Sequence, residues 1–191
     1  MKHPFFAYMA RMRYITRWAL MRNSFPENVQ EHSHQVAVLA HALAVIRRDV
    51  FHKDADPNAC AAAALFHDAS EILTGDLPTP VKYNNPTIRE AYKALEGVAQ
   101  DKLLQGLPAA MRPAYDSLLH ESDPAVAPIV KAADKLSAYL KCREELHAGN
   151  REFEQAAAET LAALRGYHME EVDWFLDTFG DTFGVTLDEL D

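Results

Sequence analysis

The feature that most constrains the fold of this chain is a hydrophobic period of about 3.6 residues, which recurs along almost its whole length. Convincing strand-like alternation of apolar and polar residues is found nowhere. The pattern predicts helices over residues 4–19, 28–50, 57–73, 87–105, 108–120, 125–148, 151–165 and 167–180. We therefore expect an all-α fold.

Two of these helices have clear end signals. Asp56 and Pro57 combine an N-cap with a proline at the first helical position, and Gly149 with Asn150 ends the long helix before them. No internal repeat or linker-like tract interrupts the 191 residues, a length that supports one sizeable core. We expect a single domain over residues 1–191.

The charge balance restricts the partners. A net charge of −9 argues against a nucleic-acid polymer or an anionic membrane, since both require an extended basic surface. A small anionic substrate remains compatible if a metal and a few local cations offset the overall field. The sequence shows no signal-peptide pattern near its start, and its longest apolar run, residues 59–66, is too short to cross a bilayer. Cys60 and Cys142 form no CxxC motif, so we expect buried, reduced thiols in a cytoplasmic protein.

Four residues of metal-ligand type occur in the order H…HD…D. His67 and Asp68 are adjacent, His32 lies 35 residues before His67, and Asp134 lies 66 residues after Asp68. A divalent cation such as Mn, Co, Fe or Ni accepts mixed imidazole and carboxylate ligands, and four ligands leave positions open for water and substrate. On a regular helix His67 and Asp68 would point about 100° apart, and Glu71 would follow on the same side, where it could transfer a proton.

The histidines differ in the face of the predicted helix that they occupy. His32 shares a stripe with Val36, Leu39 and Leu43, the face that we expect to point inward. His34 and His41 lie roughly 200° away around the helix and are interpreted as ordinary residues. Burying His32 with unpaired carboxylates would be costly, and metal coordination removes that cost.

The segment from Leu73 to Pro86 is interpreted as a rigid loop. Pro78 and Pro80 flank Thr79 and restrict the backbone on both sides. The loop follows the helix expected to carry the metal ligands, so it could position a substrate, although it could also be a simple connector.

Several segments together resemble one family. They are residues 16–23 (TRWALMRN), 27–33 (ENVQEHS), 67–83 (HDASEILTGDLPTPVKY) and 138–142 (AYLKC). With the H…HD…D order they are similar to the bacterial 5′-deoxynucleotidases of the HD-domain phosphohydrolase superfamily. The resemblance implies a helical HD-domain bundle that acts as a homodimeric, cytoplasmic enzyme. The implied reaction is metal-dependent hydrolysis of deoxyribonucleoside 5′-monophosphates to deoxyribonucleoside and phosphate.

The resemblance also implies roles for individual residues. One divalent metal ion, usually Co²⁺ or Mn²⁺, would be held by His32, His67, Asp68 and Asp134. The expected catalytic residues are Glu71, Arg17 and Asp76, with Glu71 in proton transfer and Arg17 orienting the phosphate. Substrate binding is expected at Arg17, Trp18, His32, Asp68, Asp76, Leu77, Pro78, Thr79 and Asp134.

We expect Trp18 to make the enzyme selective for deoxyribonucleotides over ribonucleotides. A bulky wall packed on C2′ leaves a 2′-hydroxyl without room or partner, so we expect ribonucleotides to be rejected, and 3′-monophosphates as well. Two alternatives stay open: another HD phosphohydrolase acting on nucleoside polyphosphates or cyclic nucleotides, and a non-catalytic nucleotide-binding helical protein. The sequence leaves open the physiological metal, the base preference, the dimer interface and the roles of Lys82 and Lys141.

Overall fold

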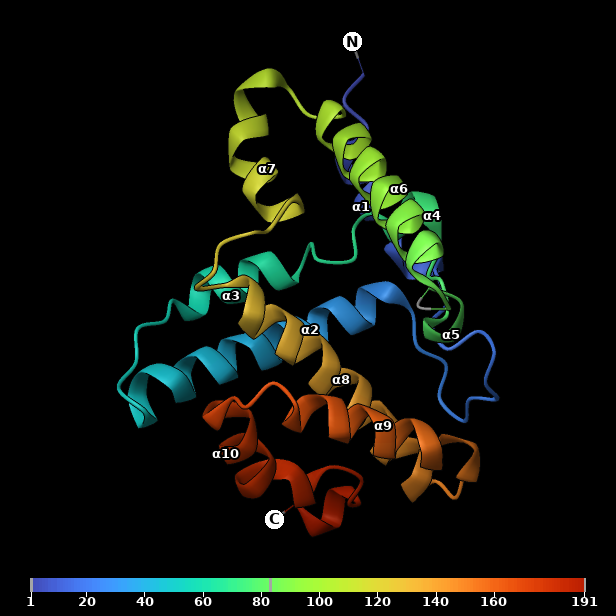
Figure 1. Ribbon diagram of the computed structural model, residues 1–191, viewed down its shortest axis with the longest axis vertical. Coiled ribbons are helices and arrows are strands. Elements are labelled where there is room, and N and C mark those ends of the chain that lie inside the picture. Colours follow the sequence, from blue (N-terminus) through green and yellow to red (C-terminus); the bar gives the residue numbers. More distant parts are fainter. Residues whose placement is uncertain (1, 83, 191) are drawn as a thin grey trace.

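The computed structural model describes residues 2–82 and 84–190, and within these ranges the chain is helical, without strands (Figure 1). The prediction of an all-α fold is confirmed. The α-helices are α1 (Phe5–Met9), α2 (Val29–Val45), α3 (Pro57–Ala64), α4 (Glu71–Thr74), α5 (Thr79–Lys82), α6 (Pro86–Gln105), α7 (Arg112–Leu119), α8 (Ala127–His147), α9 (Glu154–Arg165) and α10 (Glu170–Phe179). Every helix in this part of the chain is too short or too polar to cross a membrane.

The apolar residues form two clusters. The larger lies where α2 packs against α3 and α8, and where α8 packs against α9. The smaller is built from Phe5, Ala69, Leu103, Leu107 and Leu119, to which α1, α6 and α7 contribute, and these helices lie at the upper end in Figure 1. The chain passes from the larger cluster to the smaller through the turn between α3 and α4. That turn carries the H-D pair, which therefore lies between the two clusters.

Helix α2 follows its sequence pattern closely. The Asn28 side chain accepts a hydrogen bond from the Glu31 N–H (3.1 Å), while the Glu31 carboxylate accepts one from the Asn28 N–H (3.3 Å). This reciprocal capping box satisfies two backbone donors that the first turn leaves unpaired. His32 is buried on the inward stripe, whereas His34 and His41 are exposed, as the periodicity predicted.

The helix predicted over residues 57–73 is wrong in its second half. Its start is as expected, with Asp56 accepting bonds from the first backbone N–H groups of α3. The helix ends at Ala64, and turns with three-residue backbone spacing follow, such as Ala69 N–H to Phe66 C=O (3.0 Å). The His67 ring is hydrogen-bonded to the Ala64 carbonyl, with a distance of 2.7 Å between His67 Nδ1 and that oxygen. A side chain here replaces the backbone donor that would continue the helix.

The helix predicted over residues 4–19 is also wrong beyond its first turns. After α1 and a 3-10 turn at Met12–Tyr14 the chain becomes extended, and Thr16 forms an isolated antiparallel bridge with Asn28. Trp18 has a φ of 57°, in the left-handed region that helices exclude. Arg17 and Trp18 therefore project from a loop.

Other boundaries need smaller corrections. The helix predicted over 28–50 ends as a π-helical turn at Ile46–Val50. The segment interpreted as a rigid loop, residues 73–86, contains α5 and is not a plain loop, and its residue Tyr83 lies outside the described residues. The helices predicted to start at 108 and 151 begin with 3-10 turns, and the one predicted from 167 begins at Glu170.

Candidate functional site

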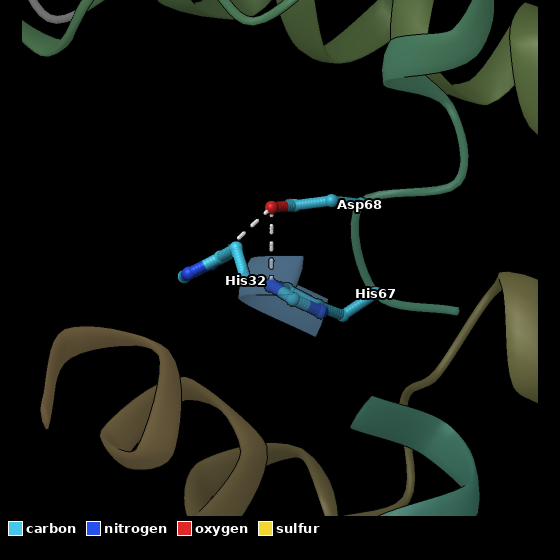
Figure 2. Close-up of side chains that lie close together, drawn as sticks. All are labelled: His32, His67 and Asp68. Atoms are coloured by element: carbon cyan, nitrogen blue, oxygen red, sulfur yellow. Dashed lines mark ion pairs between the residues drawn. The ribbon is translucent and has the colours of Figure 1, made fainter. Parts of the chain in front are cut away.

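The predicted metal ligands come together from three separate parts of the chain. His32 Nε2 lies 3.0 Å from Asp134 Oδ1 and 3.6 Å from Asp68 Oδ2. His67 Nε2 lies 3.1 Å from Asp68 Oδ2 and 4.0 Å from Asp134 Oδ1. Figure 2 shows the two imidazoles converging on the Asp68 carboxylate. Helix α2 supplies His32, helix α8 supplies Asp134, and the turn after α3 supplies His67 and Asp68.

The imidazole rings are held so that their Nε2 atoms face this centre. His67 Nδ1 can only donate to the Ala64 carbonyl (2.7 Å), which leaves its Nε2 as the acceptor of the neutral ring. His32 Nδ1 lies 3.3 Å from the Ser137 hydroxyl, which can accept its hydrogen. Among the described residues, the buried His67 Nε2 makes no hydrogen bond of good geometry, and its nearest carboxylate oxygen is Asp68 Oδ2 at 3.1 Å. Two imidazole lone pairs beside two carboxylates are a donor set that fits a divalent cation.

The local electrostatics favour positive charge at this centre. Burial would lower the pKa of His67, but Asp68 and Asp134 outweigh it and raise this pKa to about 9. Burial would raise the pKa of Asp68, yet the neighbouring His67 holds that pKa far below its usual range. Burial likewise opposes ionisation of Asp134, and the hydrogen bond from His32 brings its pKa to about 2. Both carboxylates are therefore ionised and attract a cation or a proton.

Arg17 and Trp18 lie directly beside the ligand cluster. Arg17 donates from Nη1 to Asp68 (3.3 Å) and from Nε to Glu27 (3.2 Å). Burial would lower the pKa of Arg17, but Asp68 and Asp134 raise it above its usual value. The Trp18 indole N–H donates to Glu27 (2.9 Å), and its ring packs against Phe153 with centroids 5.4 Å apart. The site thus combines the positively charged guanidinium of Arg17 with the aromatic ring of Trp18, and both side chains are held by hydrogen bonds to Glu27.

Two further carboxyl groups face the same space. Glu71, the first residue of α4, is buried, and its Oε2 has no hydrogen-bond partner among the described residues. Burial, followed by the charges of Asp68 and Asp76, raises the pKa of Glu71 to about 10. Burial also raises the pKa of Asp76, although Arg17 opposes the shift. This environment favours the protonated form of Glu71.

The loop after α4 is tied to the long helix α6. Gly75 has a φ of 75°, which turns the chain back, and the Tyr92 hydroxyl donates to the Gly75 carbonyl (3.0 Å). This bond fixes the start of the predicted substrate loop, residues 76–79.

A cavity of about 460 Å³ connects these groups. Of the predicted site residues, the described structure places all but two along its wall: Arg17, Trp18, Asp68, Glu71, Asp76, Leu77, Pro78, Thr79 and Asp134. The other two, His32 and His67, do not line the cavity, but their Nε2 atoms lie near the Asp68 carboxylate, which does. The predicted residues therefore come together at one place.

Sequence reasoning missed part of this cavity. Helix α9 contributes a stripe of Ala156, Glu159, Thr160 and Ala163, with the spacing of one helical face. Glu27 was also missed, although it contacts both Arg17 and Trp18. The α9 periodicity could have indicated an inward face, but nothing local in the sequence indicated the pairing of Glu27.

The two undecided lysines have different surroundings. Lys82 lines the cavity, pairs with Glu96 (2.7 Å) and lies over the Tyr92 ring. Lys141 is buried, pairs with Glu145 and donates to the Phe25 carbonyl. The sequence left the role of Lys141 open, and the structure shows that it is not a solvated surface residue.

The fold and the ligand cluster define a class of protein. The HD-domain phosphohydrolase lin2634 of Listeria innocua has a TM-score of 0.82 and 26% identity, covering 95% of this chain and 88% of its own. The cyanophage S-2L HD phosphohydrolase DatZ, solved with dA and one catalytic Zn²⁺ ion, has a TM-score of 0.67 and 21% identity, covering 94% and 96%. The fold is that of the HD-domain phosphohydrolases.

Sequence comparison narrows this class to one family. The family described as 5′-deoxynucleotidase YfbR-like matches residues 4–183. A 5′-deoxynucleotidase of Vibrio cholerae is 50% identical over 188 residues, which is 97% of both chains. One of Erwinia tasmaniensis is 50% identical over 188 residues, covering 97% of this chain and 95% of the relative. This chain belongs to the YfbR-like 5′-deoxynucleotidase family, which confirms the resemblance read from its motifs.

Proposed function

We propose that this protein is a metal-dependent 5′-deoxynucleotidase that hydrolyses deoxyribonucleoside 5′-monophosphates to deoxyribonucleoside and phosphate. Family membership and the two relatives at 50% identity support the reaction. The observation that carries the proposal is the convergence of two imidazole Nε2 atoms and two carboxylates next to a buried arginine, at the wall of a cavity of about 460 Å³. That volume suits a small organic ligand such as a nucleotide.

We assign the metal to His32, His67, Asp68 and Asp134. The fixed orientation of both imidazoles and the position of His67 Nε2 beside Asp68 support this donor set. A bound divalent cation would act as a Lewis acid towards the phosphoryl oxygens. Family resemblance favours Co²⁺ or Mn²⁺, and the mixed imidazole and carboxylate donors are compatible with both.

Arg17 is proposed to orient the phosphate. Its guanidinium is buried beside the ligand cluster, and the described contacts use only its Nε and Nη1. The remaining N–H groups form a planar fork that matches two phosphate oxygens. This arrangement fixes the direction of the P–O5′ bond.

Glu71 and Asp76 are proposed to handle protons. Hydrolysis forms a bond from water oxygen to phosphorus and breaks the P–O5′ bond, so the water loses a proton and the leaving 5′-oxygen gains one. Glu71 suits delivery of the proton, because its burial and the nearby carboxylates raise its pKa and favour the protonated form. Asp76, at the start of the substrate loop, lines the same cavity and is the carboxylate proposed to accept the proton that the water loses.

The sugar is proposed to lie between Trp18 and the loop residues Leu77, Pro78 and Thr79. The Trp18 ring offers a flat wall whose orientation is fixed by Glu27 and Phe153. A 2′-hydroxyl pressed on this wall would lose its hydrogen bonds to water, at about 1–3 kcal/mol. We therefore propose selectivity against ribonucleotides.

The remaining proposals rest on family resemblance. We propose one domain over residues 1–191, a homodimeric assembly and a cytoplasmic location. The buried, unpaired thiols of Cys60 and Cys142 are compatible with a reducing compartment.

Phosphate release from a nucleotide panel tests the function. The panel contains dAMP, AMP, the 3′-monophosphate of deoxyadenosine, dATP and cyclic AMP, each with EDTA, Mn²⁺ or Co²⁺. We expect release from dAMP with added metal and little from the others. Preferential hydrolysis of dATP or cyclic AMP would indicate a different HD phosphohydrolase. Asp68→Ala serves as the inactive control.

A further inference from the structure

Glu27 contacts three residues with proposed roles in binding. It lies just before α2, and its Oε2 accepts a hydrogen bond from Trp18 Nε1 (2.9 Å) and another from Arg17 Nε (3.2 Å). Its Oε1 lies 3.9 Å from His32 Nδ1. A single carboxylate thus faces the proposed phosphate ligand, the proposed sugar wall and one proposed metal ligand.

These contacts are shielded from water. The Glu27 side chain is 11% exposed and that of Arg17 is 12% exposed. The backbone holds the same pair together, because Arg17 N–H donates to the Glu27 carbonyl (3.0 Å). Hydrogen bonds to an ionised acceptor are shorter and stronger than neutral ones, so Glu27 can define the orientation of both side chains.

Alternative partners for the two side chains are few. Without Glu27, the described contacts of Arg17 would reduce to Asp68, a proposed metal ligand. The Trp18 indole N–H would lose its acceptor, and the ring would keep only its apolar packing against Phe153 and the larger core cluster.

We propose that Glu27 is a positioning residue, which aligns Arg17 with the phosphate and Trp18 with the sugar. The inference rests on the proposed function for the roles of these two residues. Glu27 touches no reacting atom.

The test compares Glu27→Ala and Glu27→Gln with the control Glu31→Gln. Glu31 lies four residues further along and caps α2, but contacts neither Arg17 nor Trp18. We would measure bound Mn²⁺, kcat and KM for dAMP and AMP, and the ¹H–¹⁵N indole signals, with the Trp18 signal assigned from Trp18→Phe.

For Glu27→Ala we expect kcat/KM for dAMP to fall on the order of 10–100-fold, as for loss of hydrogen bonds to a charged group. The ratio of dAMP to AMP hydrolysis should fall as well, and the Trp18 indole signal should shift while that of Trp174 stays. Bound Mn²⁺ should be unchanged. Glu27→Gln should lie between Glu27→Ala and the wild type, and Glu31→Gln should match the wild type.

Two results would overturn the inference. An unchanged ratio of dAMP to AMP hydrolysis together with an unchanged Trp18 signal would exclude the positioning role. A lower activity alone would not support it, because loss of folded protein lowers both activities by the same factor. Loss of Mn²⁺ in step with activity would instead assign Glu27 to the metal site. If the wild type does not hydrolyse dAMP, the proposed function fails, and the Trp18 signal alone decides the role of Glu27. If Glu27→Ala does not fold, the same measurements on Glu27→Gln decide it.

Discussion

Replacing Glu145 by alanine should destabilise the fold more than any surface charge change. Glu145 on α8 is fully buried and accepts hydrogen bonds from the backbone N–H groups of Ser24 (2.8 Å) and Phe25 (3.0 Å) and from Asn150 Nδ2 (2.8 Å). It also pairs with Lys141, which is 5% exposed. Alanine would leave this ammonium group buried and without a counter-charge.

The size of the effect can be worked out in two ways. Breaking a buried ion pair by removing one partner costs about 3–5 kcal/mol. Burial would raise the pKa of Glu145, but Lys141 and the backbone N–H of Phe25 bring it from 4.5 to about 2. Such a lowering corresponds to about 3 kcal/mol. Because the pKa is depressed in the folded state, this stabilisation is complete above pH 4.5 and is lost as the pH falls towards 2.

Urea denaturation followed by tryptophan fluorescence, from pH 7 down to pH 3, would measure both effects. We expect Glu145→Ala to lose about 3–5 kcal/mol at pH 7 and to show a weaker loss of stability on acidification than the wild type. Glu152→Ala, whose carboxylate pairs with the exposed Arg22, is the matched control and should change little. A Glu145→Ala protein as stable as the control, with wild-type pH dependence, would refute the reasoning.

Three further predictions concern the site. Asp68→Ala should lose bound metal and phosphate release together, and a metal-quantified variant with full activity would contradict the ligand assignment. Glu71→Ala should keep metal and nucleotide affinity but lower kcat by about 10²–10⁴; an unchanged kcat with a raised KM would make Glu71 a binding residue instead. Trp18→Ala should relax discrimination against AMP by about 1–3 kcal/mol, measured as the ratio of kcat/KM for dAMP and AMP. A strong deoxy preference retained in this variant would exclude Trp18 as its source.

Local sequence rules succeeded where a helix is regular and capped by its own residues. The inward face of α2 followed from its period, because the capping box of Asn28 and Glu31 fixes where the helix starts. The start of α3 followed from Asp56 and Pro57 for the same reason. Burial of His32 was therefore predictable, whereas its role as a ligand stays a prediction.

The same rules failed where distant contacts decide the backbone. The residues around His67 look helical by pattern, but the ring bonds to the Ala64 carbonyl and the segment turns instead. The extended path at Arg17 depends on the bridge between Thr16 and Asn28. The role of Glu27 depends on that bridge too, so no local pattern could have shown it.

The backbone at Trp18 has a consequence for how substrate choice could change. A non-glycine residue at a φ of 57° is strained by roughly 1 kcal/mol, and glycine would relieve that strain. The backbone at this position therefore favours glycine, whereas the packing on Phe153 and the proposed sugar contact favour tryptophan. If Trp18 forms the proposed sugar wall, Trp18→Gly would open the sugar side to ribonucleotides, and the relieved backbone strain would offset part of the packing energy lost against Phe153.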